Sequence, residues 1–364
     1  MSTIHDVARH AGVSASTVSN VLNGRAGQMR PETLERVRAA IAELKYGPST
    51  VARQLKTGHS SFIGLLIPSI ANPMFGYIAC EIERHALQHG YRVLICNAYR
   101  DRDKEAAFFQ DLLAHGVRSA IVVSSLEDER HLELAAERGM TVVSYDRRAV
   151  PGDRPGVDHV TVDSVLAARM ATRHLIEHGH RHLAFVTVSG VTMSRKDKIQ
   201  GFWQAVDEAG LRATSRVVDA GPVHQYGDSA IGEIGASCAR QLSGEPDRPT
   251  GIVALNDLMA LGVMAGLHES GLRVPQDVSV IGMDGLFLSA MSNPGLSTIE
   301  FPVTAMAAAL VDRVIGGATP GDQPAETVFT DVRLIERESV AAPRGARRKS
   351  AASPRGAAAK SNTK

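Results

Sequence analysis

The spacing of apolar residues changes near residue 60 and divides the chain into two kinds of segment. Before that point, apolar positions recur every three or four residues, which is the period of amphipathic helices. From Phe62 onward, short apolar runs alternate with amphipathic stretches of helical spacing. The strands are expected at residues 62–67, 91–97, 120–124, 141–145, 159–162, 183–188, 217–218, 251–255 and 278–282, and the helices at 74–89, 104–115, 129–138, 165–178, 198–210, 226–242 and 258–269. Strands that alternate with helices predict parallel sheets covered by helices, and two series in tandem predict two similar α/β lobes.

Residues 3–23 predict two short helices joined at Gly12. Thr3 can cap the first helix, and Asp6 three residues later completes a capping box. Gly12 supplies the sharp turn because glycine adopts a positive φ without steric cost. Ser14 can cap the second helix. The predicted buried faces consist of small and branched side chains: Val7, Ala8 and Ala11 on the first helix, Val18, Val21 and Leu22 on the second.

The opposite face of the second helix carries only small or polar residues. They are Ala15, Ser16, Thr17, Ser19 and Asn20. A helix with such a face can enter the major groove of DNA and contact base edges. The pattern therefore predicts a helix-turn-helix. The alternative is an αα-hairpin in which the glycine only ends a helix.

Four runs within this segment carry a resemblance to a known family. They are Asp6-Val7-Ala8, Ala11-Gly12-Val13-Ser14, Thr17-Val18-Ser19 and Val21-Leu22-Asn23. The segment resembles the DNA-binding headpiece of the lactose-repressor (LacI/GalR) family of bacterial transcription regulators. The resemblance implies that double-stranded operator DNA is contacted by Thr3, Ser14, Ala15, Ser16, Thr17, Ser19, Asn20 and Asn23, with base specificity at Ala15, Ser16 and Asn20.

A third helix is expected to begin at Pro31, since proline is favoured at the first helical position. It is preceded by Arg30, where the family usually has a serine cap, so weaker capping is expected there. Residues 49–55 can form one or two further turns, which are marginal alone because helix nucleation is costly. The resemblance makes this segment a hinge helix that contacts DNA through Ser49, Ala52, Arg53, Leu55 and Lys56, with Leu55 inserted into the minor groove. A plain linker is the alternative.

Polar side chains gather where the predicted strands end, which is where doubly wound sheets bind their ligands. They are Ser69, Asn72, Asn97, Asp146, Asp163, Asn256, Asp257 and Asp284. Several runs here resemble the periplasmic-binding-protein-like effector domain of the same family: Asn72-Pro73, Asp146-Arg147, Gly179-His180-Arg181, Asn256-Asp257-Leu258-Met259-Ala260 and the stretch from Val274-Pro275 to Gly282. The resemblance covers roughly residues 3–340. The expected effector-binding residues are Ser69, Asn72, Phe75, Asp146, Lys198, Asn256 and Asp284.

Two of these positions depart from the family pattern. Lys198 stands where the family has a ligand-contacting arginine, and lysine keeps the charge but loses the planar fork that grips two oxygens. Gly285 stands where the family has a second aspartate after Asp284. A polyhydroxylated, sugar-like ligand fits the remaining groups. The two departures leave an acidic sugar or another carboxylate open.

These patterns predict a three-helix helix-turn-helix headpiece at residues 1–46, a hinge at 47–60 and a two-lobed α/β core at 61–340. Lobe 1 is expected at 61–159 and 293–322, and lobe 2 at 160–292 and 323–340. The tail from 341 to 364 is rich in Ala, Ser, Gly, Pro and basic residues and cannot bury a core. Because it lacks leucine heptads, a homodimer is expected rather than a tetramer held by a C-terminal bundle.

The two ends of the chain differ from its middle in net charge. The net charge is +1. Residues 1–60 carry eight Lys and Arg against four Asp and Glu, and residues 341–364 carry seven basic residues and no acidic ones. The middle is correspondingly acidic, so only the head is expected to face a polyanion. The basic tail either adds weak DNA affinity or is merely solvated.

Other classes of protein find little support. The chain shows no signal peptide and no stretch near the roughly 20 apolar residues of a membrane helix, and its three cysteines suit a reducing cytoplasm. A zinc site at His174, His178, His180 and His182 lacks a completing carboxylate or cysteine nearby. No G-x-G-x-x-G follows a predicted strand, which disfavours a dinucleotide-binding enzyme. A secreted sugar-binding protein would need a signal peptide and no DNA-reading head.

The sequence therefore predicts a cytoplasmic, dimeric, ligand-responsive transcription regulator, with no enzymatic activity, metal or cofactor. It is expected to act as a repressor at a near-palindromic operator, since two-fold protein symmetry requires two-fold DNA symmetry.

Overall fold

The computed structural model describes residues 2–22, 24–25, 27, 29–47, 60–123, 130–153, 156–190, 192–222, 230–317 and 325–344. The chain divides after Ser61 into two compact units, which we describe separately. Most of the tail and the hinge, with the predicted hinge contacts Ser49, Ala52, Arg53, Leu55 and Lys56, lie outside the described residues, as does Asn23.

The first unit contains the helices α1 (Ile4–Ala11), α2 (Ala15–Leu22) and α3 (Pro31–Glu43). The predicted capping box is confirmed: Thr3 Oγ1 accepts from the Asp6 amide at 3.3 Å, and Asp6 Oδ2 accepts from the Thr3 amide at 2.9 Å. Gly12 ends α1 with a φ of 63°. Ser14 Oγ accepts from the Thr17 amide at 3.1 Å, which is the predicted cap of α2.

The three helices share a small apolar core formed by Val7, Ala8, Ala11, Val18, Val37 and Ala40. Arg30 precedes α3 and makes no side-chain cap hydrogen bond, as its type predicted. Two contacts outside the core join α1 and its leading residues to α3. His10 Nε2 lies 2.6 Å from Glu43 Oε2, and Ser2 Oγ donates to the Leu44 carbonyl at 2.9 Å.

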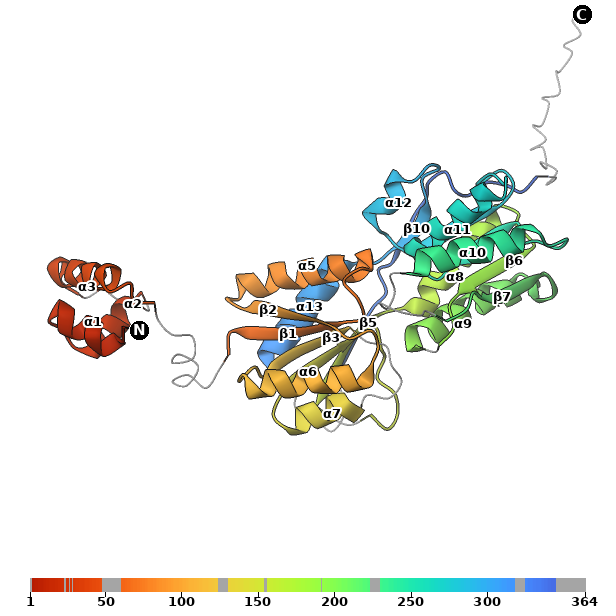
Figure 1. Cartoon of the computed structure of the whole chain (residues 1–364). Coiled ribbons are helices and arrows are strands. Elements are labelled where there is room, and N and C mark those ends of the chain that lie inside the picture. The colour runs from red at the N-terminus through yellow and green to blue at the C-terminus, as the bar shows by residue number, and fades with distance from the viewer. Residues whose placement is uncertain are drawn as a thin grey trace, which may run out of the picture. The chain divides into compact units, whose positions relative to one another are not determined.

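The second unit contains two six-stranded sheets, which confirms the predicted two-lobed α/β core (Figure 1). The first sheet has the order β11-β5-β4-β3-β1-β2 and is parallel throughout. Its strands are β1 (Phe62–Ile67), β2 (Arg92–Asn97), β3 (Ser119–Val123), β4 (Thr141–Tyr145), β5 (Val157–Val162) and β11 (Glu326–Phe329). Helices α5 (Pro73–Gln88) and α13 (Val303–Gly316) cover one face, and α6 (Arg102–Ala114) and α7 (Arg130–Glu137) cover the other (Figure 1).

The second sheet has the order β12-β10-β9-β8-β6-β7, and only β12 runs antiparallel to its neighbour. Its strands are β6 (Leu183–Thr187), β7 (Ser215–Asp219), β8 (Gly251–Ala254), β9 (Ser279–Asp284), β10 (Ser297–Glu300) and β12 (Arg333–Ile335). The helices of this lobe are α8 (Ser164–Glu177), α9 (Met193–Glu208), the 3₁₀ turn η1 (Arg212–Thr214), α10 (Ile231–Ser243), α11 (Asp257–Glu269) and α12 (Phe287–Met291). No helix in the described part of the chain is long and apolar enough to cross a bilayer.

The C-terminal strands correct the expected division between the lobes. Residues 293–322 were expected in lobe 1; α13 does pack on the first sheet, but β10 pairs with β9 of the second sheet, with Ser297 opposite Ile281. Residues 323–340 were expected in lobe 2; β12 does join the second sheet, but β11 pairs with β5 of the first sheet, with Glu326 opposite His159. The expected boundary at 159 also falls inside β5. Each of these short strands belongs to the lobe whose sheet it pairs with. A run of four residues does not reveal its pairing partner, so the sequence alone did not predict the lobe.

Two helix pairs of the second lobe approach so closely that glycine is required between them. A Cβ built on Gly262 of α11 would lie 1.9 Å from the Gly232 carbonyl oxygen of α10. A Cβ built on Gly201 of α9 would lie 2.1 Å from the Val165 carbonyl oxygen of α8. Both obstructing atoms are backbone, so the helices themselves would have to separate to accept a side chain.

We predict that Gly262→Ala destabilises the protein by about 1–3 kcal/mol, because the added methyl group would force α10 and α11 apart. In a lobe of this size, that corresponds to a fall in Tm of several degrees in thermal unfolding followed by circular dichroism. Gly316→Ala is the matched control, since its Cβ would meet nothing within 4 Å. Equal melting of the two variants would contradict the close-packing argument.

Candidate functional site

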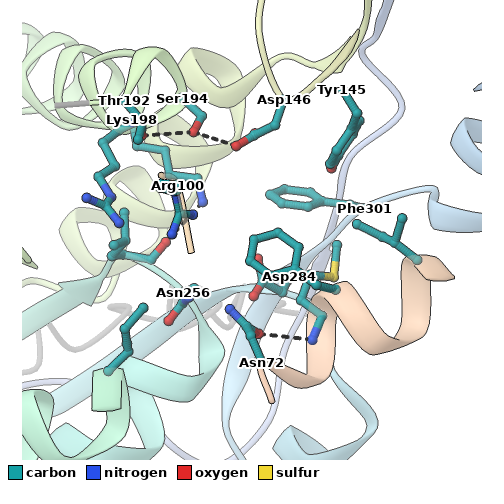
Figure 2. A pocket seen from close by; sticks show the side chains of 16 residues that line it. Asn72, Arg100, Tyr145, Asp146, Thr192, Ser194, Lys198, Asn256, Asp284 and Phe301 are labelled. Carbon is teal, nitrogen blue, oxygen red and sulfur yellow. Dashed lines mark hydrogen bonds between the residues drawn. The ribbon is translucent and has the colours of Figure 1, made fainter. Parts of the chain in front are cut away.

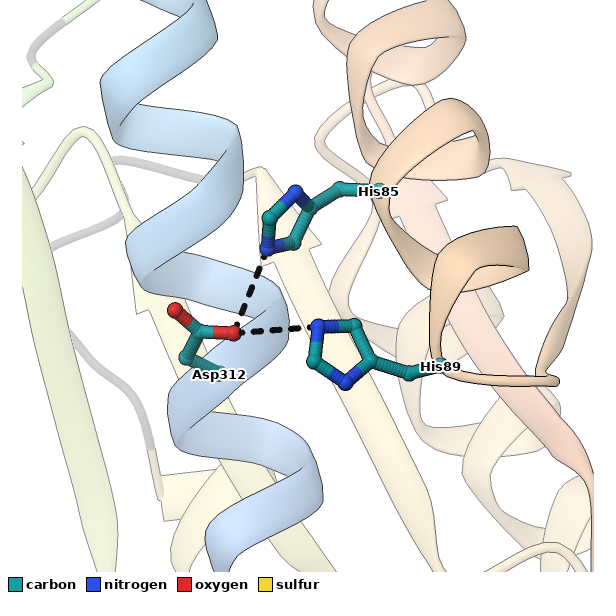
Figure 3. Close-up of side chains that lie close together, drawn as sticks. All are labelled: His85, His89 and Asp312. Carbon is teal, nitrogen blue, oxygen red and sulfur yellow. Dashed lines mark hydrogen bonds and ion pairs between the residues drawn. The ribbon is translucent and has the colours of Figure 1, made fainter.

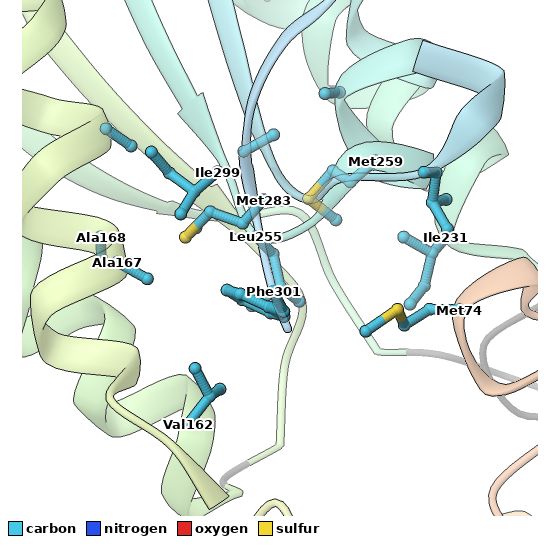
Figure 4. Packing of buried hydrophobic residues seen from close by; sticks show 14 of the residues in the cluster. Met74, Val162, Ala167, Ala168, Ile231, Leu255, Met259, Met283, Ile299 and Phe301 are labelled. Carbon is cyan, nitrogen blue, oxygen red and sulfur yellow. The ribbon is translucent and has the colours of Figure 1, made fainter. Parts of the chain in front are cut away.

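A small cavity of about 60 Å³ lies between the two lobes of the core, and Figure 2 shows its lining. The first lobe contributes Asn72, Met74, Phe75, Ile78, Arg100, Tyr145 and Asp146. The second lobe, with the segment that leaves β10, contributes Thr192, Ser194, Arg195, Lys198, Ile231, Leu255, Asn256, Asp284 and Phe301. The apolar part of the cavity lining continues into the buried core of this unit. Four residues belong both to the lining and to the core: Met74, Ile231, Leu255 and Phe301 (Figure 4).

Three helices begin at this cavity. Asn72 Oδ1 caps α5 by accepting from the Met74 amide at 3.1 Å. Asn256 Oδ1 caps α11 by accepting from the Met259 amide at 2.9 Å, and Thr192 caps α9. Each of these two asparagine caps uses the side-chain oxygen as its acceptor. The three helix N-termini also bring partial positive charge to the cavity.

Two carboxylates stand at strand ends in unusual backbone conformations. Asp146 follows β4 with a φ of 72°, and Asp284 ends β9 with a φ of 136°. L-residues seldom adopt such values, and they tend to persist where function requires a fixed side chain. Burial raises the pKa of Tyr145 well above its usual value, and the carboxylates of Asp146 and Asp284 add to this rise. Tyr145 therefore stays a neutral phenol beside them.

Three cationic side chains line the cavity together with these two carboxylates. Lys198 Nζ donates to the Leu255 carbonyl at 3.1 Å and lies 5.6 Å from the centre of the Phe301 ring. Arg195 stands one helical turn earlier, and its guanidinium donates to the carbonyl oxygens of residues 189 and 190. Arg100 lies over the Phe75 ring at 5.8 Å. The cavity lining thus carries one more formal positive charge than negative charge.

Two contacts join the lobes beside the cavity. Ser194 Oγ of α9 donates to Asp146 Oδ2 at 2.8 Å, as Figure 2 shows. Next to it, Arg148 of the first lobe pairs with Asp197 of α9 at 2.6 Å. Because both contacts reach from the end of β4 to the first turns of α9, they resist separation of the lobes at this side of the cavity.

A buried carboxylate supports the loop that follows Asp284. Asp257 accepts from the Leu286 amide at 2.8 Å, from Ser289 Oγ at 2.7 Å and from Thr298 Oγ1 at 2.5 Å. Burial raises its pKa. Gly285 lies within this loop at a φ of 74°, and a Cβ there would approach the Glu300 Cα to 2.7 Å. The missing second aspartate of the family motif therefore has a steric reason.

Six of the seven expected effector residues line the cavity: Asn72, Phe75, Asp146, Lys198, Asn256 and Asp284. Ser69, the seventh, does not line the cavity: it lies in the turn before α5, where its Oγ accepts from the Ala71 amide at 3.2 Å. Three of the other strand-end residues have structural roles: Asn97 accepts from the Ile70 amide, Asp163 caps α8 and Asp257 holds the loop described above.

Sequence reasoning missed several polar lining residues: Arg100, Tyr145, Thr192, Ser194 and Arg195. Arg195 carried a usable signal, since it stands three residues before Lys198 and therefore on the same face of α9. Arg100 carried a weaker one, because it follows the end of β2 by three residues.

Helix α2, which is expected to read DNA and is called the recognition helix below, exposes only part of its expected polar face. Ser16 and Asn20 are exposed, as expected, whereas Ala15 is half-buried and packs against the head core. The expectation of a fully outward Ala15 is therefore wrong. Ser14 and Thr17 are tied to each other through their hydroxyl groups at 2.8 Å, and Thr3 is engaged in its capping box. Ser19 is half-buried.

The histidines at 174–182 do not gather around a common point. Both ring nitrogens of His180 have protein partners, Thr250 Oγ1 at 3.0 Å and the Ala341 carbonyl at 2.9 Å. His178 Nδ1 is bound to the His174 carbonyl at 2.8 Å. Among the described residues, this group does not form a cluster able to hold a metal ion.

Comparison with known proteins decides the family. Residues 3–49 match the description of bacterial regulatory proteins of the lacI family, and residues 172–340 match a periplasmic binding protein-like domain. The HTH-type transcriptional repressor PurR of Edwardsiella ictaluri is 32% identical, over 94% of this chain and 97% of that protein. The chain belongs to the lacI family of bacterial transcription regulators.

Solved structures of lacI-family proteins agree with this assignment. A lac repressor dimer bound to operator and the anti-inducer ONPF is 28% identical, with a TM-score of 0.77 over 94% of this chain and 99% of that one. A lacI-family regulator from Enterococcus faecium with bound ribose is 25% identical, with a TM-score of 0.65 over 77% of this chain and 99% of that one. The chain is thus a ligand-responsive, DNA-binding lacI-family regulator and not an enzyme, and membership of this family implies a cytosolic location.

The buried His180 generates a pH prediction for this lacI-family core. Burial lowers its pKa from 6.5 to about 4. As the pH falls, His180 is protonated in the unfolded chain before it is protonated in the folded protein. The neutral imidazole therefore does not reduce the free energy of unfolding above about pH 6.5, and this free energy falls as the pH drops from 6.5 toward 4. We predict a loss of roughly 2 kcal/mol between pH 7 and pH 5 from this residue.

Urea unfolding of His180→Gln at both pH values should show a smaller pH-dependent loss than the wild type. His182→Gln, which alters an exposed neighbour, should behave like the wild type. An unchanged pH dependence in His180→Gln would contradict the assignment.

Proposed function

We propose that this lacI-family protein is a repressor that binds a near-palindromic operator as a homodimer and whose operator affinity is set by a small polar effector in the interlobe cavity. The supporting observation is the presence, in one chain, of an exposed polar recognition helix and a cavity whose polar lining comes from both lobes. A DNA-bound population would be associated with the nucleoid.

The DNA-reading residues of the proposal are Ser16 and Asn20, with Ala15 contributing less because it packs inward. An asparagine side chain can pair with the edge of an adenine, and a serine hydroxyl can donate to or accept from several bases. Thr3, Ser14, Thr17, Ser19 and Asn23 remain proposed contacts on the family resemblance, as do the hinge residues Ser49, Ala52, Arg53, Leu55 and Lys56.

A homodimer is supported by apolar surface on the second lobe. Phe287 and Met291 on α12 have exposed fractions of 67% and 75%, which is unusual for side chains of that size. The two residues are one turn apart on one short helix. A second copy of the chain is the proposed partner for this surface, and the lac repressor in the related structure is a dimer bound to its operator.

The proposed effector is a small polyhydroxylated molecule, and charge favours one that carries an acidic group. Related structures hold ribose, cellobiose and D-xylulofuranose. Asp146, Asp284 and the two asparagine amides suit hydroxyl groups, since they offer acceptors and donors side by side. The excess positive charge of the lining and the three converging helix N-termini favour an anionic substituent such as the carboxylate of a sugar acid.

Effector binding would act by bridging the lobes. Asn72 and Asp146 would hold the ligand from the first lobe, and Lys198, Asn256 and Asp284 would hold it from the second. A ligand that contacts both lobes binds one arrangement of the lobes better than others and shifts the population toward it. The hinge residues would transmit this change to the paired heads.

A thermal-shift screen with matched pairs tests the effector class. Each neutral sugar is compared with its aldonic or uronic acid at equal ionic strength, because a ligand that binds only the folded protein raises its Tm. The proposal expects an acid to raise Tm and to change operator affinity, whereas its neutral partner acts more weakly. A response to neutral sugars alone would overturn the acidic preference and leave the repressor proposal standing.

We predict that Asn20→Ala and Ser16→Ala change the order of preference among operator variants. Each lost base contact should cost about 1–3 kcal/mol at the affected base pair, whereas a phosphate contact would weaken all operators equally. Binding to a panel of single-substituted operators at fixed salt measures this. Arg38→Ala, on the exposed face of α3, is a control for general loss of positive charge. An unchanged ranking in both variants would contradict base reading.

We predict that Asp284→Ala abolishes the effector response while operator binding without effector survives. Removing the carboxylate leaves the ligand without an acceptor that is held at a fixed backbone angle. The measurement is operator affinity with and without the acid found by screening. Ser69→Ala is the matched control, because Ser69 lies near the cavity but does not line it. If Asp284→Ala and Lys198→Ala both respond like the wild type, the cavity is not the effector site.

A further inference from the structure

A cluster of two histidines and one aspartate joins helices α5 and α13 away from the interlobe cavity (Figure 3). His85 and His89 are four residues apart at the end of α5, and Asp312 comes from α13. Nε2 of His85 lies 3.2 Å from Asp312 Oδ1, and Nε2 of His89 lies 3.5 Å from the same oxygen. The site and function described above use none of these residues.

We propose that His85, His89 and Asp312 form a binding site for a transition-metal ion, with Zn²⁺ as the ion to test. Imidazole nitrogen and carboxylate oxygen are common zinc ligands, and two histidines four apart on a helix present their rings on one side. Magnesium and calcium prefer sites built wholly from oxygen, so this donor set disfavours them.

The distances fit such an ion. Bonds of about 2.0–2.1 Å in tetrahedral geometry place neighbouring ligand atoms about 3.3–3.4 Å apart. The two measured nitrogen–oxygen distances, 3.2 and 3.5 Å, bracket that value. All three ligand atoms lie within 4.8 Å of one another, and in the described residues no other group of three such side chains meets this condition.

The surroundings favour a cation and leave room for it. His89 caps the C-terminal end of α5, where the last carbonyl groups carry partial negative charge. His89 and Asp312 have side-chain exposed fractions of 43% and 59%, so an ion can enter from solvent. Three protein ligands with an accessible fourth position would leave that position to water or to a further ligand.

The ion would join two helices that both lead to the interlobe cavity. Helix α5 begins beside Asn72, which lines the cavity, and α13 begins two residues after Phe301, which also lines it. A metal ion would therefore brace the first-lobe helices that border the effector site.

Zinc titration of the full-length protein tests the proposal, with affinity measured by competition against a chromophoric chelator. We expect one site per chain with a micromolar or tighter Kd, and an increase in Tm on adding Zn²⁺. His89→Gln and Asp312→Asn should each weaken binding at least tenfold. Asparagine keeps a hydrogen-bond acceptor at position 312, so its effect separates metal binding from a simple hydrogen bond between the side chains.

Two controls address other zinc-binding groups. His178→Gln disrupts the adjacent rings of His174 and His178, which have the same spacing, and Cys80→Ser removes an exposed thiol on α5. Both should bind zinc like the wild type, and Co²⁺ should give the visible spectrum of a tetrahedral site only when residues 85, 89 and 312 are intact. Unchanged binding in His89→Gln and Asp312→Asn, or wild-type binding only at millimolar zinc, would overturn the proposal.

Discussion

The hydrogen bond between Ser194 and Asp146 is the contact on which the interlobe cavity depends most directly. Asp146 belongs to the first lobe and Ser194 to the second, and the Arg148–Asp197 ion pair lies beside them. The polar groups that line the cavity come from both lobes, so neither lobe forms the cavity alone. In the described residues, the chain passes from one sheet to the other after β5, β10 and β11. These three segments connect the lobes covalently, and the side-chain contacts beside the cavity favour one arrangement of the lobes.

The carboxylate of Asp284 is held in place by residues that do not themselves line the cavity. Asp284 keeps a φ of 136° because the loop after it is fixed by Asp257 and by the fit of Gly285 against Glu300. The backbone energy required by such a conformation must be offset by the surrounding contacts. Asn256 and Asp257 are neighbours at the start of α11. The first caps the helix beside the cavity, and the second binds the loop that follows Asp284.

Sequence patterns predicted the order of strands and helices up to Asp284 because each βα unit carries its own local period. They did not predict β10, β11 or β12, which are strands of three or four residues whose sheet membership depends on partners far away in the chain. The same limit applies to the site. Asp146 and Asn256 directly follow strands and were predictable, whereas Arg100 stands three residues beyond β2 and its approach to the cavity depends on tertiary packing; Ser69 also follows a strand but bonds within its own turn.

The lysine at position 198 changes how the cavity holds its charge. Its ammonium already donates to the Leu255 carbonyl and lies near the Phe301 ring, so it acts as a fixed point charge in the wall. A planar guanidinium fork stands one turn earlier on α9, at Arg195, which lines the cavity and donates to the carbonyl oxygens of residues 189 and 190. This position is closer to the helix N-terminus, where backbone donors also favour an anion. The lining therefore keeps a guanidinium near the N-terminus of α9 and a fixed ammonium one turn further along that helix, and the proposed preference for an acidic effector rests on this arrangement.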